Sequence, residues 1–274
     1  MREGAFKKYS KKTLVYLFLI IMSLISVFPL YWCFVSAFNT TPEILGGKLI
    51  PGTHLIENIT NLLDQQRVFT ALKNSFINTI LVLILSLTVC SLAGYGFEVY
   101  HDKAKDAVMG LLMLSMMVPF VATLVPMFQM FSAMGLMNKY IGFVLPSIST
   151  PFLIMLFRNN ARNFPKEIIE AARMDGLNEV QIFFRMFVPT MRPTYAAAAT
   201  ITFMNSWNAY MWPRVIFKTN ESVTMPMLVS NLMNGYVLDY GVIMAGVTIC
   251  TLPTVIIFFV LQKSFTEAIA GSVK

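Results

Sequence analysis

The chain has 274 residues, of which 56% are hydrophobic and 13% are charged, and its mean hydropathy is +0.65. A water-soluble domain has about 25% charged residues, so this composition indicates a chain whose main solvent is a lipid bilayer. The net charge is +7, but the basic residues lie in short stretches between apolar segments, which argues against a nucleic-acid-binding surface. The three cysteines lie far apart inside apolar runs, as is typical of small buried hydrophobic residues.

Six apolar segments are long enough to cross about 30 Å of hydrocarbon, which takes about 20 residues of helix. They comprise residues 13–38, 72–97, 107–132, 141–157, 194–216 and 241–262. The first follows a basic stretch, but it is too long for a signal peptide and lacks a small-x-small cleavage site. Prolines are expected to interrupt or kink the third and fourth segments: Pro119, Pro126, Pro146 and Pro151. The sequence predicts an all-α membrane protein with six transmembrane helices.

The basic residues predict the orientation of these spans. With the N-terminus inside, fifteen of the 21 basic residues fall on the cytoplasmic side, as the positive-inside rule requires. Both termini are then cytoplasmic. We expect a cytoplasmic N-terminal segment at 1–12, a transmembrane domain at 13–262 with a cytoplasmic loop at 158–193, and a cytoplasmic tail at 263–274. Residues 39–71 and 217–240 form the long outer connections.

The loop at 158–193 has the pattern of two short helices separated by a turn. Pro165 suits the first turn of the first helix, which is expected over residues 166–174. Asp175-Gly176 is a turn signal, because glycine adopts a positive φ without a Cβ clash.

The second helix of this loop is predicted to open at Asn178, because Gln181 three residues later resembles the partner of a capping box. Pro189 and Pro193 are expected to end this helix and lead into the fifth span. Its apolar stripe is predicted to comprise Val180, Phe183, Phe184 and Phe187.

The first helix of the loop has features of a docking surface. Ala171 and Ala172 are small enough to let another surface approach closely, and Glu170 can offer a carboxylate to a basic partner. An amphipathic linker lying on the membrane, with Glu170 paired to Arg173, accounts for the same pattern. The pattern alone does not decide between the two.

Two stretches carry a family resemblance. The run EAARMDG at residues 170–176, followed by MFVP at 186–189, resembles the EAA motif of ABC importer permeases. FMNSWNAYMWP at 203–213 is similar to the W-N-x-aromatic-x-W-P stretch of the carbohydrate branch, and AGSVK at 270–274 resembles the closing residues of that branch.

The resemblance covers nearly the whole chain and is closest to the smaller permease subunit of maltose-type importers. Glu98 departs from the family pattern, since such proteins often have a basic residue at this place after the second span, and Thr266-Glu267 differ in the tail.

The resemblance implies a type I ABC importer permease fold in which the loop carries a coupling helix. That helix docks into a cleft of a cytoplasmic ATPase, whose closure on ATP switches the spans between inward-open and outward-open states. The residues that the resemblance assigns to this contact are Glu170, Ala171, Ala172, Asp175, Gly176 and Pro189.

The implied partners are a second homologous permease subunit, two ATPase subunits that bind ATP and Mg²⁺, and an extracytoplasmic binding protein near the loop 217–240. The expected location is the inner membrane of a prokaryote. The chain itself is expected to be no enzyme and to bind no cofactor, because it contains no G-x-x-x-x-G-K-[ST] phosphate loop.

The implied substrate is a di- or oligosaccharide, and a glycerol phosphate ester is the alternative. Polar groups inside the spans are candidates for the substrate path, because they are costly when they face lipid. The candidates are Asn74, Asn78, Ser115, Gln129, Asn205, Asn208 and Tyr210. For each of them, helix–helix hydrogen bonding or anchoring at the interface is the competing explanation. In the maltose relatives the partner permease makes much of the sugar contact.

Three other classes of protein compete with an importer, and the sequence does not exclude the third, a non-transporting scaffold. An ion-coupled transporter usually has ionisable residues inside its spans, and the cores of the six segments contain none. A membrane enzyme needs a catalytic or metal constellation. His54 and Glu57 have only a lone H-x-x-E spacing, and His101 is expected to be a solvated loop residue.

Overall fold

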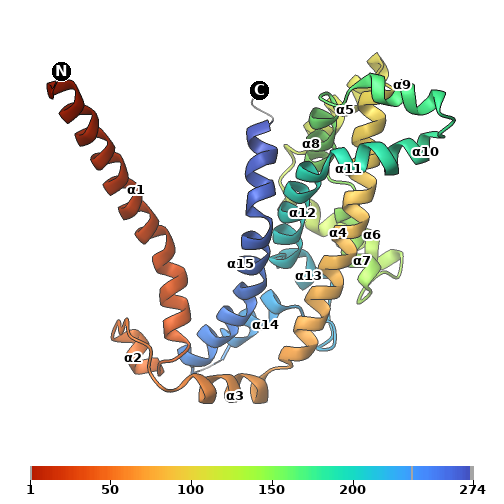
Figure 1. The fold of residues 1–274 in the computed structure, drawn as a ribbon. Helices are drawn as coiled ribbons and strands as arrows, with labels where there is room; N and C mark the ends of the chain where they lie inside the picture. Colours follow the sequence, from red (N-terminus) through yellow and green to blue (C-terminus); the bar gives the residue numbers. More distant parts are fainter. Residues whose placement is uncertain (1, 236, 272–274) are drawn as a thin grey trace. The chain divides into compact units, whose positions relative to one another are not determined.

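The computed structural model describes residues 2–235 and 237–271, with side chains described for residues 12–235 and 237–262. Within these residues every regular element is a helix, so the all-α prediction is confirmed. In chain order the elements are α1 (Arg2–Ser36), α2 (Thr41–Leu45), α3 (Leu55–Gln65), α4 (Val68–Val99), α5 (Lys103–Ser115), α6 (Phe120–Ala133), α7 (Tyr140–Ile148), α8 (Pro151–Ala161), α9 (Lys166–Met174), α10 (Glu179–Ile182), the π-helix η1 (Phe183–Phe187), α11 (Val188–Thr190), α12 (Arg192–Trp207), α13 (Met211–Ile216), α14 (Met225–Leu232) and α15 (Tyr240–Gly271) (Figure 1).

Three single helices of the described chain are long and apolar enough to cross a bilayer: residues 12–36 of α1, all of α4, and residues 240–262 of α15. Two further candidates are bent pairs. α5 and α6 meet at 100°, and α7 and α8 meet at 45°. Pro119 caps α6 at the larger bend and Pro151 opens α8, whereas Pro126 and Pro146 lie inside their helices without ending them.

The predicted fifth span, residues 194–216, is not one continuous helix. α12 ends at Trp207, and α13 begins only at Met211. The Asn208 side chain donates to the Met204 carbonyl oxygen at 2.9 Å, which offers the backbone an alternative to the helical ladder. This break opens a polar, aromatic turn where the sequence predicted a continuous span.

The ends of the chain continue the first and last spans. α1 begins at Arg2, so residues 2–12 of the predicted N-terminal segment 1–12 have a helical backbone that is continuous with the first span. α15 extends to Gly271, which includes most of the predicted tail 263–274; residues 272–274 lie outside the described residues.

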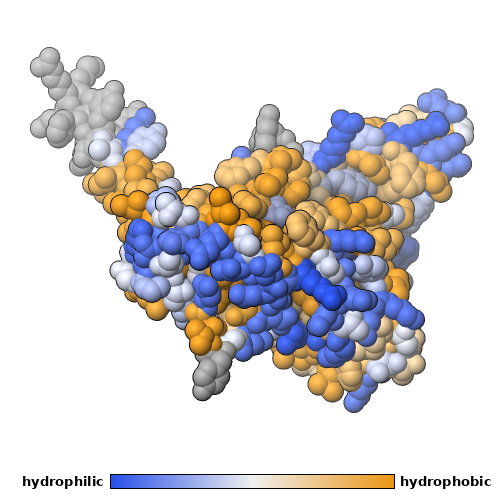
Figure 2. All heavy atoms as spheres, turned by 90° about the horizontal axis from the view of Figure 1, so that it is seen from below, coloured by the Kyte–Doolittle hydropathy of each residue, from blue (hydrophilic) through white to orange (hydrophobic). Residues whose placement is uncertain are grey.

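The chain forms two compact units, of which the first contains residues 1–67 and 229–251. In this unit, amide hydrogen bonds join α3 to the chain that follows α1. Asn58 Nδ2 donates to the carbonyl oxygens of Ala37 at 2.9 Å and Asn39 at 3.1 Å. A Cβ at Gly241 would lie 2.7 Å from the Asn58 side chain, so this close approach requires glycine. Figure 2 looks from the lower end of Figure 1 and shows hydrophilic side chains gathered over the middle of that face.

The second unit contains residues 68–228 and 252–274. Its central feature is the close packing of α4 against α8. A Cβ at Gly94 would lie 2.6 Å from the Cβ of Phe157 and 2.8 Å from the backbone nitrogen of Arg158, so the helices touch there with no room for a side chain. Cys90, Leu153 and Phe157 are buried in the same contact. This fixed pair carries the site described below.

Candidate functional site

The loop at residues 158–193 forms the predicted helix–turn–helix. α9 ends at Met174, and Gly176 has a φ of +79°, the conformation that its turn requires. Asn178 then caps α10: its side-chain oxygen accepts from the Gln181 backbone N–H at 2.9 Å, and Gln181 Oε1 accepts from the Asn178 N–H at 3.0 Å. The predicted turn and capping box are therefore both present.

The two arms of this loop enclose an apolar core of their own. Ile169 and Ala172 of α9 are buried against Ile182, Phe183 and Phe187, together with Tyr95, Ala161, Phe164 and Met191. The rings of Phe187 and Tyr95 are 4.8 Å apart, so this core also joins the loop to α4. We call this unit, residues 164–191, the elbow. It is a packed structure and not an open linker.

The elbow corrects two expectations. Ala172 is 3% exposed inside the elbow core, so its small size serves internal packing and not the surface. In the predicted apolar stripe only Phe183 and Phe187 are buried, while Val180 and Phe184 are 65% and 54% exposed. The π-helical turn at Phe183–Phe187 holds more residues per turn than an α-helix, which keeps Phe183 and Phe187 on one face and rotates Phe184 outward.

The outer surface of the elbow presents Glu170, Ala171, Asp175 and Gly176 to solvent, with Met174 88% exposed between them. The expected alternative pairing of Glu170 with Arg173 does not form. Arg173 Nε instead donates to Glu179 Oε1 at 2.8 Å, and Tyr100 donates to the other Glu179 oxygen at 2.5 Å.

These contacts have an electrostatic consequence for the elbow surface. Arg173 first, and then Tyr100, hold the pKa of the Glu179 carboxyl below its ordinary value. Among the described side chains Glu170 has no such partner. Its carboxylate borders a recess of about 460 Å³ next to Arg162 and Lys166.

Pro189 lies one residue before the end of the second helix of the loop. The helical backbone runs from α10 through η1 and α11 to Thr190, and α12 begins at Arg192 after a turn at Met191, so this helix ends between the two prolines as predicted. Pro193 lies in the first turn of α12, where its missing N–H has no intrahelical partner to lose. α10 and α11 run across the direction of α12 (Figure 1), so the elbow meets the fifth span at a bend.

The N-terminal end of α12 directly follows the elbow, and its C-terminal end lines a cavity of about 700 Å³. Three predicted path residues line this cavity: Asn205, Asn208 and Tyr210. Its other lining includes the aromatic side chains of Phe120, Phe143, Phe152 and Trp212. Among the described residues, no charged side chain lines it.

Sequence reasoning missed four hydroxyl groups in the same cavity: Ser147, Thr150, Thr202 and Ser206. The hydroxyl oxygens of Thr202 and Ser206 are buried and have no hydrogen-bond partner within the described part of the chain. A buried hydroxyl without a partner is costly, which makes these two atoms candidates for contact with a ligand. The available signal was spacing, because Thr202, Asn205 and Ser206 recur at i, i+3 and i+4 on one helix face.

The remaining path candidates lie elsewhere. Asn74 donates to the carbonyl oxygens of Glu221 at 2.7 Å and Val223 at 3.0 Å, and it accepts from Tyr140 at 3.1 Å, so it fastens the segment between α13 and α14 to α4. Asn78 is buried and its amide has no partner among the residues that the structure describes, but it does not line the cavity. Ser115 and Gln129 are exposed on α5 and α6 and lie outside the cavity lining as well.

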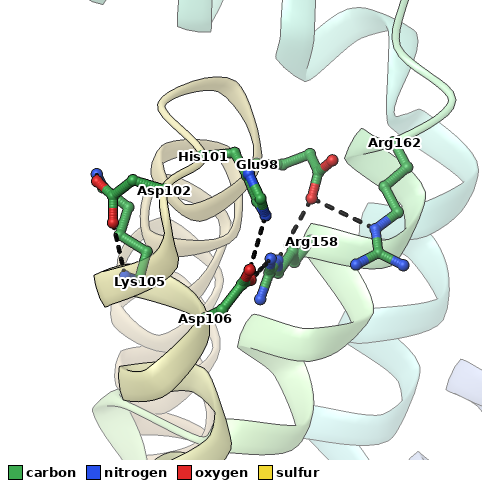
Figure 3. A network of polar contacts seen from close by, with 7 residues as sticks. All are labelled: Glu98, His101, Asp102, Lys105, Asp106, Arg158 and Arg162. Atoms are coloured by element: carbon green, nitrogen blue, oxygen red, sulfur yellow. Dashed lines mark hydrogen bonds and ion pairs between the residues drawn. The ribbon is translucent and has the colours of Figure 1, made fainter.

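A charged cluster lies where α4, α5 and α8 meet (Figure 3). Arg158 contacts Glu98 Oε2 at 3.3 Å through Nε and Asp106 Oδ1 at 2.5 Å through Nη2. Arg162 reaches the same Glu98 oxygen at 3.4 Å. Glu98, the departure noted in the sequence, is thus the acidic partner of two arginines.

The two histidines have ordinary roles in the described structure. His101 Nε2 lies 3.0 Å from Asp106 Oδ2, so it belongs to the charged cluster and is not simply solvated as expected. His54 Nδ1 lies 2.9 Å from Glu57 Oε2. Among the described residues, no group of three or more His, Cys, Asp or Glu side chains is arranged to hold a metal ion.

Known proteins resemble this chain over almost its whole length. It is 40% identical over 259 residues to the lactose transport system permease protein LacG of Rhizobium radiobacter, covering 94% of this chain and 95% of that protein. It is 33% identical over 259 residues to the arabinooligosaccharides transport system permease protein AraQ of Halalkalibacterium halodurans, covering 92% and 93%. The sn-glycerol-3-phosphate transport system permease protein UgpE of Escherichia coli is 27% identical over 258 residues, covering 90% and 92%.

Solved structures resemble the fold. A chain of a bacterial ABC transporter involved in the import of the acidic polysaccharide alginate matches with a TM-score of 0.82 at 20% identity, covering 93% of this chain and 96% of that chain. The MetNI methionine ABC transporter matches with a TM-score of 0.56 at 19% identity, covering 77% and 98%. At these identities the likeness concerns the fold alone.

Residues 86–270 match the family described as binding-protein-dependent transport system inner membrane component. The permease subunits of this family are not enzymes and carry no cofactor of their own; they work in the inner membrane with ATPase and binding-protein partners. Together with the permease relatives and the matching folds, this match shows that the chain belongs to the inner membrane permease subunits of binding-protein-dependent ABC importers.

Proposed function

We propose that this permease imports a neutral di- or oligosaccharide and that the exposed surface of α9 docks into a cleft of a cytoplasmic ATPase. The observation that carries the proposal is the packed elbow, which leads through a turn at Met191 into α12, whose far end lines the cavity. A displacement of the elbow is passed to α12 across this short connection, because Phe183 and Phe187 hold the second arm in the elbow core.

The free carboxylate of Glu170 supports the docking part of this proposal. It stands next to Ala171 on the exposed surface of α9, with Asp175 and Gly176 at the end of the same helix. A basic side chain of the ATPase can form a charge-assisted hydrogen bond with it at no loss to the elbow, since Arg173 is occupied by Glu179. Pro189 lies just before the turn at Met191 that leads into α12.

The chemistry of the cavity favours a neutral sugar over a glycerol phosphate ester. A phosphate monoester carries a charge of about −1.5 to −2 and is usually held by arginine or lysine. The cavity offers hydroxyls, amides and aromatic rings instead. The sugar permeases LacG and AraQ are also more similar to this chain than UgpE is, at 40% and 33% against 27% identity.

The assembly that fits this role has a second homologous permease, two ATPase subunits that bind ATP and Mg²⁺, and an extracytoplasmic binding protein that meets residues 217–240. Both termini then lie in the cytoplasm, with the permease domain at 13–262 between them. One elbow per chain supports the need for a partner permease, because each ATPase requires a docking surface.

Reconstitution tests this function directly. The complex is purified from membranes, its subunits are identified, and it is placed in proteoliposomes with its binding protein. We expect a neutral oligosaccharide to stimulate ATP hydrolysis and to accumulate, and sn-glycerol 3-phosphate to do neither. Uptake that follows an ion gradient without ATP, or a preference for the phosphate ester, would contradict the proposal.

A further inference from the structure

Arg158 is an unusual residue for its position in the molecule. It lies on α8 one turn before the elbow, among the buried apolar residues Leu153, Ile154 and Phe157, and its side chain is only 6% exposed. A buried guanidinium without partners is strongly unfavourable, so its two carboxylate contacts are required for this placement.

The two carboxylates come from two different helices. Glu98 lies at the end of α4, and Asp106 lies in the first turn of α5. Arg158 reaches them through separate nitrogens, Nε at 3.3 Å and Nη2 at 2.5 Å (Figure 3). The planar fork of arginine can hold both at once, so a single side chain of α8 joins three helices.

The three helices differ in how else they are held. At Gly94, α4 and α8 are already in backbone contact, so their relative position does not depend on Arg158. α5 packs on this pair through Met109, with Leu112 and Met113 partly buried. It then turns by 100° into α6. The Arg158–Asp106 ion pair is therefore the polar tie at the elbow end of α5.

This tie connects the elbow to the cavity by a second route. α6 begins at Phe120, and that side chain lines the same cavity as Asn205 and Ser206 of α12. A displacement of the elbow moves α12, which follows it in the chain. It moves α5 and α6 only to the extent that α5 moves together with α8. We infer that Arg158 is a positioning residue, which binds α5 to α8 and α4 so that one movement of the elbow shifts both walls of the cavity.

This inference rests on the proposed function, and its test uses the assembled complex in proteoliposomes with its binding protein. The measured quantity is the amount of sugar imported per ATP hydrolysed. We expect Arg158→Gln to lower this ratio at least about fivefold, because coupling between sites typically amounts to factors of 5 to 150. ATP hydrolysis stimulated by the binding protein is expected to remain.

Two further variants separate positioning from folding. Asp106→Asn leaves Arg158 paired with Glu98, so the complex is expected to assemble normally and still import less sugar per ATP. The exchange of Arg158→Asp with Asp106→Arg restores the tie with reversed charges and is expected to recover part of the ratio. Lys105→Gln, which breaks the exposed Asp102–Lys105 ion pair at the same end of α5, serves as the control and should leave the ratio unchanged.

A wild-type ratio in Arg158→Gln would overturn the inference. If that variant fails to assemble, Asp106→Asn decides, and a wild-type ratio there would also overturn it. A proportional loss of transport and hydrolysis, with the ratio intact, counts against positioning as well. Failure of the proposed function is distinguishable, because it would appear as absent sugar import in the wild-type complex.

Discussion

The elbow leads into α12, whose far end lines the cavity, and the polar groups of these two regions are in opposite states. In the elbow the capping groups are paired, Arg173 is bound to Glu179, and the apolar residues fill a core. In the cavity the buried hydroxyls of Thr202 and Ser206 have no partner among the described residues. A satisfied network rigidifies, whereas unpaired buried groups are costly until something binds them. The comparison supports the proposal that the elbow transmits force and that the cavity receives a ligand.

The largest effect is expected at the exposed face of the elbow. Glu170→Lys reverses the carboxylate that stands next to Ala171 on this surface, so we expect loss of ATPase retention and of sugar uptake. Retention is measured by copurification through a tag on the permease, and uptake by labelled sugar in proteoliposomes. Glu167→Lys, the same change one turn earlier on α9, is the control and should retain the ATPase. Normal uptake by Glu170→Lys would refute the docking role.

The next largest effect concerns the elbow core. Phe187 is fully buried and its ring contacts Tyr95, Phe164 and Phe183, so Phe187→Ala should cost about 3–5 kcal/mol of folding free energy. We expect a lower Tm of the purified complex and faster proteolysis within residues 164–191. Phe184→Ala removes the same ring from an exposed position and should change Tm little. Equal effects of the two variants would mean that the elbow is not packed as described.

A smaller, selective effect is expected in the cavity. Ser206→Ala and Thr202→Val each remove an unpaired hydroxyl, so they should leave Tm unchanged or raise it. If these hydroxyls bind the sugar, each variant loses about 1 kcal/mol of binding, which corresponds to roughly a fivefold rise in half-saturating sugar–binding-protein complex. The measurement is uptake against concentration. Unchanged uptake in the variant that carries both substitutions would show that the cavity is not part of the substrate path.

The smallest effect is expected at the Arg173–Glu179 pair on the elbow surface. Because the folded-state pKa of Glu179 is lowered, its stabilising contribution is present above its unfolded pKa and is lost as the pH falls through the lowered value. Glu179→Gln should therefore lower Tm slightly at neutral pH, and the difference from the wild type should vanish in acid. Thermal unfolding at several pH values checks this, and a difference that grows in acid would contradict the assignment.

The sequence was sufficient where structure depends on neighbouring residues. Asp175-Gly176 and Asn178 with Gln181 determine their turn and cap within a few residues, and both were predicted. Pro189 and Pro193 likewise indicated where the second helix ends, and the structure places that end at Thr190, between the two prolines. The break after Trp207 was missed, since Asn208 in an apolar run gives no local sign that it will bond to its own backbone.

Contacts between residues that lie far apart in the sequence could not be predicted in this way. The partners of Arg158 are separated from it by 60 and 52 residues, so Glu98 was recognised only as a departure from the family pattern. Thr202 and Ser206 were passed over because hydroxyls in a membrane helix usually bond to their own backbone, as Thr200 does to the Ala196 carbonyl oxygen at 2.8 Å. Only the spatial arrangement distinguishes the two kinds of hydroxyl.

The π-helical turn at Phe183–Phe187 also bears on how the chain tolerates changes of length. Inserting or deleting one residue in an α-helix rotates everything beyond it by about 100°. A π-helical turn contains more residues than an α-helical turn. It can therefore hold one inserted residue while the helices on either side stay in register. Deletion of Phe184, the exposed residue of that turn, should tighten it to an ordinary α-turn and leave the faces of α9 and α12 where they were. Deletion of one residue within α12 would instead rotate the side chains beyond it, so those that line the cavity would point away from it.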